Sequence, residues 1–134
     1  MMQFDHIGVF VPSLSEGRET LKQLLPIVRE GPEIEDNGLK VAVQFLYDRA
    51  DICYELVAPL GVGNPVDPVL SDKKNILNHI AYQCTDFDDE ITRFREQGAV
   101  PLGPPQPAKA FGGARVVFFL TPLRMIVELI EAQS

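Results

Sequence analysis

The sequence is short of basic residues and of long hydrophobic runs. Its 134 residues include 12 lysines and arginines against 19 acidic residues, and the net charge is −7. No basic stretch is available to neutralise phosphates, which argues against a nucleic-acid partner and against an anionic membrane surface. The apolar runs have only the length of strands, and no basic N-terminal region precedes a hydrophobic one as in a signal peptide. We therefore expect a cytoplasmic protein without a membrane span.

Cysteine is also scarce. Cys53 and Cys84 are the only two cysteines, and each lies inside an apolar segment. This pattern favours buried, reduced thiols over a disulfide framework, with a single bridge between them as the alternative. It offers no zinc site of paired cysteines. Any chemistry in this chain is expected to depend on other residue types.

The sequence contains a repeat of about half its own length. A shift of 73 residues, without gaps, places His6 on His79 and Glu55 on Glu128. The same shift aligns Val43 with Val116, Phe45 with Phe118, and Gly31-Pro32 with Pro104-Pro105. The chain is thus one motif written twice. A half of about 60 residues would be marginally stable alone, so one compact domain over 1–134 is expected.

Both halves are predicted to have the same order of elements. In the first half we expect strands at 4–11, 27–29, 39–47 and 52–58, with a helix that begins at Ser13 and ends before Pro26. In the second half we expect strands at 76–84, 100–102, 114–120 and 125–130, with a helix over 86–97 that Asp86 caps and Gly98 closes. Residues 59–75, rich in glycine and proline, are predicted to be a linker.

Two glutamates lie in strands that are otherwise apolar. Glu55 falls within 52–57 and Glu128 within 125–130, and both segments are hydrophobic at most positions. Such strands are usually buried on both faces, so each carboxylate is predicted to point into the protein, where an unpaired charge is very costly. No lysine or arginine stands at matching places in both halves, and Arg124 could reach only one glutamate. A metal ion would compensate both.

Two histidines complete the set. His6 and His79 lie in the first strand of their halves, each followed by isoleucine. Two imidazole nitrogens and two carboxylate oxygens suit Zn²⁺, Ni²⁺, Co²⁺, Mn²⁺ or Fe²⁺ and leave up to two positions for water or a chelating substrate. The alternative is that all four are packing or edge residues. Packing alone would favour leucine or valine there, because these four groups are among the most costly to bury.

The segments around these residues resemble a known family. Asp5-His6-Ile7-Gly8, Tyr54-Glu55-Leu56, Asn78-His79-Ile80-Ala81 and Val127-Glu128-Leu129 are similar to the vicinal oxygen chelate superfamily, which includes glyoxalase I, methylmalonyl-CoA epimerase, extradiol dioxygenases and resistance proteins. The resemblance implies an α+β fold with two tandem βαβββ modules, at about 4–59 and 76–131, that form a glyoxalase-like half-barrel metal-binding cleft. It also implies the ligands His6, Glu55, His79 and Glu128 for one divalent metal ion, and a homodimer.

Within that superfamily the resemblance is strongest to methylmalonyl-CoA epimerases. It rests on segments 54–60, 78–82 and 111–119. It implies an epimerase or isomerase that transfers a proton next to a metal-chelated carbonyl, with Glu128 as the first base and Glu55 opposite. Its substrate would be a small molecule such as an acyl-CoA or a thiol adduct. Two features differ from the epimerase pattern: the turn at 121–124 is short, and residues 40–46 of the third strand, where some epimerases have an acid, offer Gln44 as their only uncharged polar candidate.

Four further residues are candidates for the substrate pocket. Gln44 is one, and Gln83 shares strand parity with His79. Arg115 and Arg124 are the others, because guanidinium groups pair well with carboxylate or phosphate. For each of them, an ordinary role as a spacing or surface residue is the alternative.

Three other functions remain open at this point. A glyoxalase I-type lactoylglutathione lyase would return the proton to the neighbouring carbon. An extradiol-type dioxygenase needs two histidines and one carboxylate, and the fourth ligand Glu55 argues against it. A small-molecule-binding protein of the resistance type would use the cavity without a metal, so stoichiometric metal would favour catalysis.

Overall fold

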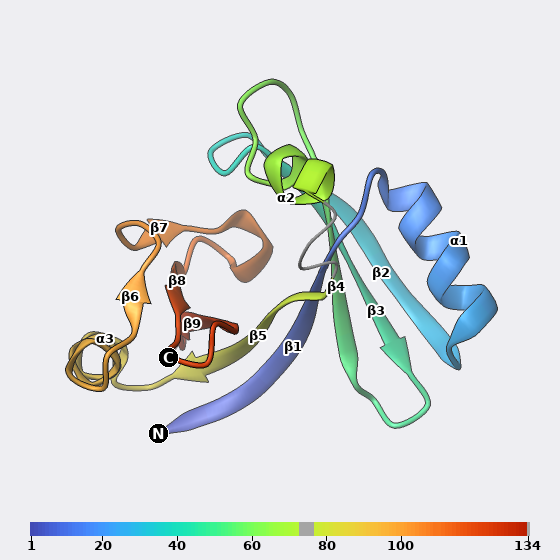
Figure 1. Ribbon diagram of the computed structural model, residues 1–134. Helices are drawn as coiled ribbons and strands as arrows, with labels where there is room; N and C mark the ends of the chain where they lie inside the picture. Colours follow the sequence, from blue (N-terminus) through green and yellow to red (C-terminus); the bar gives the residue numbers. More distant parts are fainter. Residues whose placement is uncertain (73–76, 134) are drawn as a thin grey trace. The chain divides into compact units, whose positions relative to one another are not determined.

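The computed structural model describes residues 1–72 and 77–133 (Figure 1). Its contacts divide the chain into two compact units. The first unit is His6–Asn78, and the second unit combines Met1–Asp5 with His79–Ser134. The boundaries lie directly before His6 and directly before His79, the two histidines of the repeat. Each unit therefore contains one of them.

The first unit contains four strands in the order β2-β3-β4-β1. They are β1 (Met2–Phe10, from His6 onward in this unit), β2 (Ile27–Asp36), β3 (Val41–Asp48) and β4 (Cys53–Pro59). β1 runs parallel to β4, and the other pairs are antiparallel. Helix α1 (Leu14–Leu24) packs on one face of β3 and β4, where Leu46 and Leu56 are fully buried. The other face is left for His6 and Glu55.

Helix α1 begins as the sequence predicts. The Ser13 side chain accepts a hydrogen bond from the Glu16 backbone N–H at 3.1 Å, and the helix ends at Leu24, two residues before Pro26. Ser13 thereby satisfies one of the N–H groups that a helix start leaves without an intrahelical partner. This cap fixes where the chain turns from β1 into the helix.

The second unit repeats the order with additions. Its strands follow the order β1-β5-β9-β8-β6, and β7 also pairs with β8. The elements are β5 (Leu77–Cys84, from His79 onward in this unit), α3 (Phe87–Glu96), β6 (Val100–Pro101), β7 (Gln106–Pro107), β8 (Arg115–Leu120) and β9 (Ile126–Glu131). Helix α3 covers one face through Phe87, which packs with the fully buried Phe119 and Leu129. The α+β class predicted from the sequence is confirmed.

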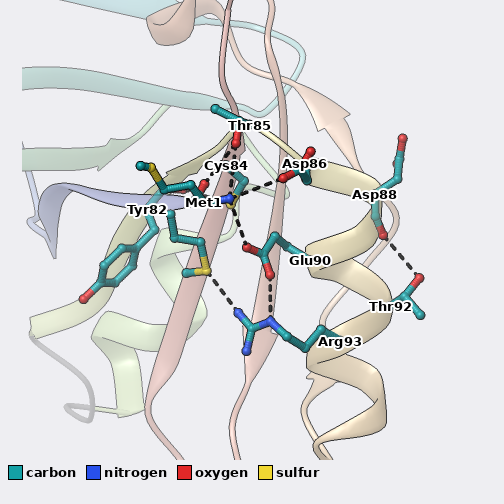
Figure 2. Close-up of polar contacts among 10 residues, drawn as sticks. Met1, Tyr82, Cys84, Thr85, Asp86, Asp88, Glu90, Thr92 and Arg93 are labelled. Atoms are coloured by element: carbon teal, nitrogen blue, oxygen red, sulfur yellow. Dashed lines mark hydrogen bonds and ion pairs between the residues drawn. The ribbon is translucent and has the colours of Figure 1, made fainter.

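Asp86 does not cap α3 as expected. It occupies the N-cap position, but its side chain makes no hydrogen bond to the helix backbone. Its carboxylate instead accepts a hydrogen bond from the amino group of Met1 at 3.3 Å, as Figure 2 shows. The end of the helix agrees with the prediction, because Gly98 follows it with φ of +90°, a conformation that glycine adopts without strain.

Three other expectations are corrected. Strand β2 continues to Asp36, although the predicted strand ended at residue 29 and a polar loop was expected to follow, because its pairing with β3 resumes beyond an irregularity between Glu30 and Glu33. A short helix, α2 (Val66–Asp72), interrupts the predicted linker and starts where the Asn64 side chain accepts hydrogen bonds from the N–H groups of Val66 and Asp67. The segment between the strands predicted at 100–102 and 114–120, expected from its prolines to be a loop, contains β7 and a 3₁₀ turn, Lys109–Phe111. Residues 73–76, which include the start of the strand predicted at 76–84, lie outside the described part of the chain.

Both cysteines are free and buried, as predicted. Burial raises the pKa of the Cys84 thiol to about 11, with a further contribution from the nearby Glu90 carboxylate, so this thiol stays neutral at ordinary pH. None of the helices in the described part of the chain is long and apolar enough to cross a membrane.

Candidate metal centre

The first unit contains a buried histidine–glutamate pair. His6 on β1 and Glu55 on the parallel neighbour β4 approach to 3.2 Å between Nε2 and Oε1. Their side chains are 0% and 7% exposed. Gly8 is the direct backbone partner of Glu55 and has no side chain, so His6 is the side chain of β1 that meets the carboxylate.

The second unit contains the equivalent pair. His79 on β5 and Glu128 on β9 approach to 3.1 Å between Nε2 and Oε1, with side chains that are 1% and 3% exposed. β5 and β9 are again parallel neighbours, and the small residue Ala81 is the direct partner of Glu128. The predicted burial of all four groups is therefore observed, and each unit brings together its own two.

A phenylalanine accompanies each pair. The rings of His6 and Phe45 lie 6.0 Å apart with an interplanar angle of 71°, and those of His79 and Phe118 lie 5.0 Å apart at 83°. Phe45 is the cross-strand partner of Glu55, and Phe118 is that of Glu128. The sequence analysis did not assign a role to these residues, although the repeat aligns them. Each unit thus carries the same histidine, glutamate and phenylalanine.

The two pairs have the spacing of metal ligands. Nitrogen and oxygen ligands lie about 2.0 to 2.2 Å from a transition-metal ion, which puts neighbouring ligand atoms about 2.8 to 3.6 Å apart for octahedral or tetrahedral angles. The observed separations of 3.2 and 3.1 Å fall in this range. An imidazole N–H could donate to a carboxylate at the same distance when no ion is bound. The donor types, burial and spacing all fit a divalent transition metal.

The structure does not bring Gln44 to the face that carries Glu55. Directly paired residues of adjacent strands share a face, and Gln44 pairs with Leu56, whose side chain packs under α1. Gln44 accordingly accepts a hydrogen bond from Arg18 of α1 at 2.8 Å and donates one to the Gly31 carbonyl at 2.9 Å. Its position differs from that expected of a pocket residue because the hairpin register gives it the opposite parity.

Arg115 also lies on the helix-covered face. Its guanidinium donates to Glu131 at 2.7 Å and to Asp88 of α3 at 3.3 Å, and it stacks over the Phe87 ring. These hydrogen bonds raise the pKa of Arg115, and the hydrogen bond from Arg115 is the main cause that lowers the pKa of Glu131. Arg124 is exposed in the turn between β8 and β9, with φ of 66°. In the part of the chain that the structure describes, neither arginine contacts a histidine–glutamate pair.

Other polar residues do lie on the faces that carry the pairs. Gln83 lies on the face of His79 and donates a hydrogen bond to Asp5 at 2.8 Å. In the first unit, Tyr47 pairs across the strands with Cys53, two residues before Glu55, and the Arg29 guanidinium lies 3.7 Å from the Tyr47 ring centroid. Burial is the main cause that raises the pKa of Tyr47, followed by the neighbouring Cys53. This position of Tyr47 could not be predicted from the sequence, because the face of the residue follows from the hairpin register alone.

The chain matches a family model and two curated proteins. Residues 5–118 match the family model described as the glyoxalase/bleomycin resistance protein/dioxygenase superfamily. In Bacillus subtilis, the uncharacterized protein YqjC is 27% identical over all of this chain and 95% of its own length. The ethylmalonyl-CoA/methylmalonyl-CoA epimerase of Cereibacter sphaeroides is 28% identical over 87% of this chain and 86% of its own.

Solved structures share the fold. The hypothetical protein BH1468 from Bacillus halodurans superimposes with a TM-score of 0.82 at 22% identity, over 99% of this chain and 96% of that one. Methylmalonyl-CoA epimerase from Mycobacterium tuberculosis superimposes with a TM-score of 0.76 at 21% identity, over 98% of this chain and 88% of that one. At these identities the likeness establishes the fold.

Proposed function

Because the chain belongs to the glyoxalase/bleomycin resistance protein/dioxygenase superfamily, we propose that it is a metal-dependent epimerase or isomerase. The reaction would move a proton at a carbon atom next to a chelated carbonyl group. The observation that carries this proposal is a buried histidine–glutamate pair in each unit, at positions related by the 73-residue shift. The similarity to a protein named as an ethylmalonyl-CoA/methylmalonyl-CoA epimerase favours an acyl-CoA substrate.

The proposed ligands are His6, Glu55, His79 and Glu128, which together would hold one Zn²⁺, Ni²⁺, Co²⁺, Mn²⁺ or Fe²⁺ ion. A divalent cation there would supply positive charge that stabilises negative charge developing on a substrate carbonyl oxygen. Each unit would contribute one nitrogen and one oxygen ligand. The spacing within each pair and the near-complete burial of all four groups support this arrangement.

Proton transfer is assigned to the two glutamates. In the proposal, the Glu128 carboxylate takes the proton from the carbon next to the carbonyl, and Glu55, which would carry a proton only while it is released from the metal, gives that proton to the opposite face of the same carbon. The protonation states are then exchanged between the two residues, and solvent restores them. The third strands support this assignment, because neither β3 nor β8, both described in full, presents a carboxylate on the face of the pairs: Val41, Val43, Phe45 and Tyr47 on β3, and Val116, Phe118 and Leu120 on β8.

The test begins with the metal content of the purified protein, followed by reconstitution with each of the five ions. Methylmalonyl-CoA is then incubated with the protein in D₂O, and loss of the proton at its acidic carbon is followed by NMR. The hemithioacetal of methylglyoxal and glutathione serves as a second substrate, because return of the proton to the neighbouring carbon would indicate glyoxalase chemistry instead. We expect about one ion per chain and metal-dependent exchange on the CoA ester.

Three variants separate the roles of the residues. His79→Ala should lose metal while it remains folded, and Glu128→Gln should slow exchange by at least about 100-fold, as is typical for loss of a catalytic acid or base. Gln44→Leu is the control, because Gln44 lies on the other face of β3. Unchanged metal content in His79→Ala would refute the metal site. Bound metal without proton exchange on either substrate would refute the proposed reaction, whereas a folded protein that holds no metal would favour a binding protein.

A further inference from the structure

We propose that Phe45 and Phe118 are positioning residues of the metal site, which hold the ligand imidazoles in place and keep water from the ligand carboxylates. They would thereby set how tightly the site binds its ion. This inference rests on the proposed function, because it assumes that the histidine–glutamate pairs bind a metal. It concerns residues that the proton-transfer scheme does not use.

The first argument is the geometry of the ring pairs. His79 and Phe118 are nearly perpendicular, at 83° with centroids 5.0 Å apart, and His6 and Phe45 form a looser version, at 71° and 6.0 Å. Edge-to-face contacts at 4.5 to about 7 Å are the preferred arrangement of aromatic pairs. Such a contact opposes rotation of the imidazole about its own side-chain bond. The direction of the Nε2 lone pair is therefore constrained before any ion binds.

The second argument is the position of each phenylalanine beside a carboxylate. Phe118 is directly opposite Glu128, and Phe45 is directly opposite Glu55. Side chains of such cross-strand partners start only about 4.5 to 5.5 Å apart. An apolar ring at this distance excludes water and lowers the local dielectric, which strengthens the attraction between a carboxylate and a cation. Each phenylalanine therefore acts on both members of its pair.

The third argument is that the repeat keeps these residues and changes their neighbours. On the face of the pairs, the 73-residue shift retains Phe45 as Phe118 and Val43 as Val116, and it changes only the outer positions, Val41 to Ala114 and Tyr47 to Leu120. On the helix-covered face of the same strands, it exchanges Leu46 for Phe119 and Gln44 for Val117. General packing explains an apolar residue at each place, but it does not explain why identity is kept beside the glutamates, while every position on the helix-covered face of β3 is changed. Direct contact with an identical His–Glu pair in each unit does explain why these residues are retained.

The experiment is a titration with Co²⁺, followed by the visible absorption of the bound ion. Phe118→Leu should weaken Co²⁺ binding about tenfold, the lower end of the usual effect of residues that orient metal ligands, and should change the position or intensity of the bands. Phe45→Leu should act in the same direction with a smaller effect, because its ring lies farther from the imidazole.

The matched control is Phe119→Leu. It is the same change in the next residue of β8, but Phe119 is fully buried in the core under α3 and packs against Phe94. This variant should lose stability to urea yet bind Co²⁺ within about twofold of the wild type, because it does not touch the pair. Loss of stability and loss of metal affinity are thereby separated.

The outcomes are distinct. Wild-type affinity and an unchanged spectrum in folded Phe118→Leu and Phe45→Leu would overturn the inference while leaving the proposed function intact. A wild-type protein that binds no Co²⁺ would overturn the proposed function, and the inference with it. If Phe118→Leu does not fold, Phe45→Leu decides, because its ring lies in the other unit.

Discussion

The side chain of Gln44 replaces part of the backbone pairing that β2 loses at Gly31-Pro32. Gln44 is only 5% exposed, and its amide donates to the Gly31 carbonyl while it accepts from Arg18. The Gly31 carbonyl lies within the irregular stretch between Glu30 and Glu33. A buried amide that makes both kinds of hydrogen bond is a structural residue, since an unpaired polar group there would be costly.

We therefore predict that Gln44→Leu is destabilised by about 1 to 3 kcal/mol, because it leaves the Gly31 carbonyl and the Arg18 guanidinium without this partner. The free energy of unfolding is measured by urea titration, and Co²⁺ affinity is measured on the same protein. Metal affinity should be unchanged. As a control, Gln83→Leu removes an exposed amide with one recorded partner, Asp5, and should cost less stability. A stable Gln44→Leu variant with weakened metal binding would contradict the placement of Gln44.

The face of a residue could be predicted from the sequence only within one strand. Parity within a strand correctly placed Gln83 with His79. No such reference existed for Gln44 or Arg115, because their parity relative to the glutamates depends on the register of a hairpin. That register is set by the turns between the strands, and a shift of one residue would reverse every side chain. The phenylalanines were detectable in the repeat, but their contacts with the histidines were not.

Arg115 links three elements of the second unit. From β8 it binds Glu131 on β9 and Asp88 on α3, and its guanidinium lies 4.9 Å from the centroid of the Phe87 ring. The hydrogen bond from Arg115 lowers the pKa of Glu131 below its ordinary value. A carboxyl group with a lowered pKa in the folded state stabilises the fold above its ordinary pKa, and this contribution disappears as the pH falls through the folded-state pKa.

The predicted consequence is a pH-dependent effect of Glu131→Gln. Near neutral pH the variant should be less stable than the wild type, and the difference should shrink as the pH falls and the wild-type carboxyl is protonated. Urea unfolding at several pH values between neutral and acid measures this difference. Glu96→Gln, at the end of α3, is the control, because Glu96 forms no ion pair with any residue that the structure describes. A difference that stays constant with pH would show that the Arg115–Glu131 contact is not the cause.

Elements with a strong local signal were predicted well, and those that depend on context were not. Helix α1 has its cap, apolar stripe and terminal proline in the sequence, and it forms as expected. Strand β2 is rich in glutamate and contains Gly31-Pro32, so only pairing with β3 reveals its length. Helix α2 was hidden by the prolines around it, although Asn64 is a typical capping residue and provided a signal.

Metal binding should affect the stability of the molecule as a whole. The four proposed ligands are buried and come from both units, and they would be dispersed in the unfolded chain. An ion that binds only the folded state stabilises it by about 2.7 kcal/mol when its concentration is 100 times its dissociation constant. We therefore predict that Co²⁺ raises the thermal unfolding midpoint and that a chelator reverses the increase.

His79→Ala is the comparison for this measurement, because it removes one proposed ligand, and its midpoint should not respond to Co²⁺. An equal response of wild type and variant would indicate binding elsewhere, for example to the exposed acidic residues of a chain with a net charge of −7.

At this scale the sequence predicted the fold class, the order of elements and the burial of the four polar groups. It did so because duplication displays each important residue twice, and the cost of burying charge makes such positions conspicuous. It did not predict that Met1–Asp5 would group with the second half of the chain. That grouping depends on long-range contacts, such as the hydrogen bond between Thr85 and the Met1 carbonyl, which no local pattern encodes.

The interrupted strand β2 also has a consequence for solubility. It is the outer strand of the first unit, and exposed outer strands are templates on which other chains add and aggregate. Pro32 has no N–H to offer such a strand, and the charged side chains of Arg29, Glu30, Glu33 and Glu35 are exposed along the same edge. These features disfavour the addition of another strand at β2 and therefore disfavour fibril growth there. We expect any self-association of the protein to use a different surface.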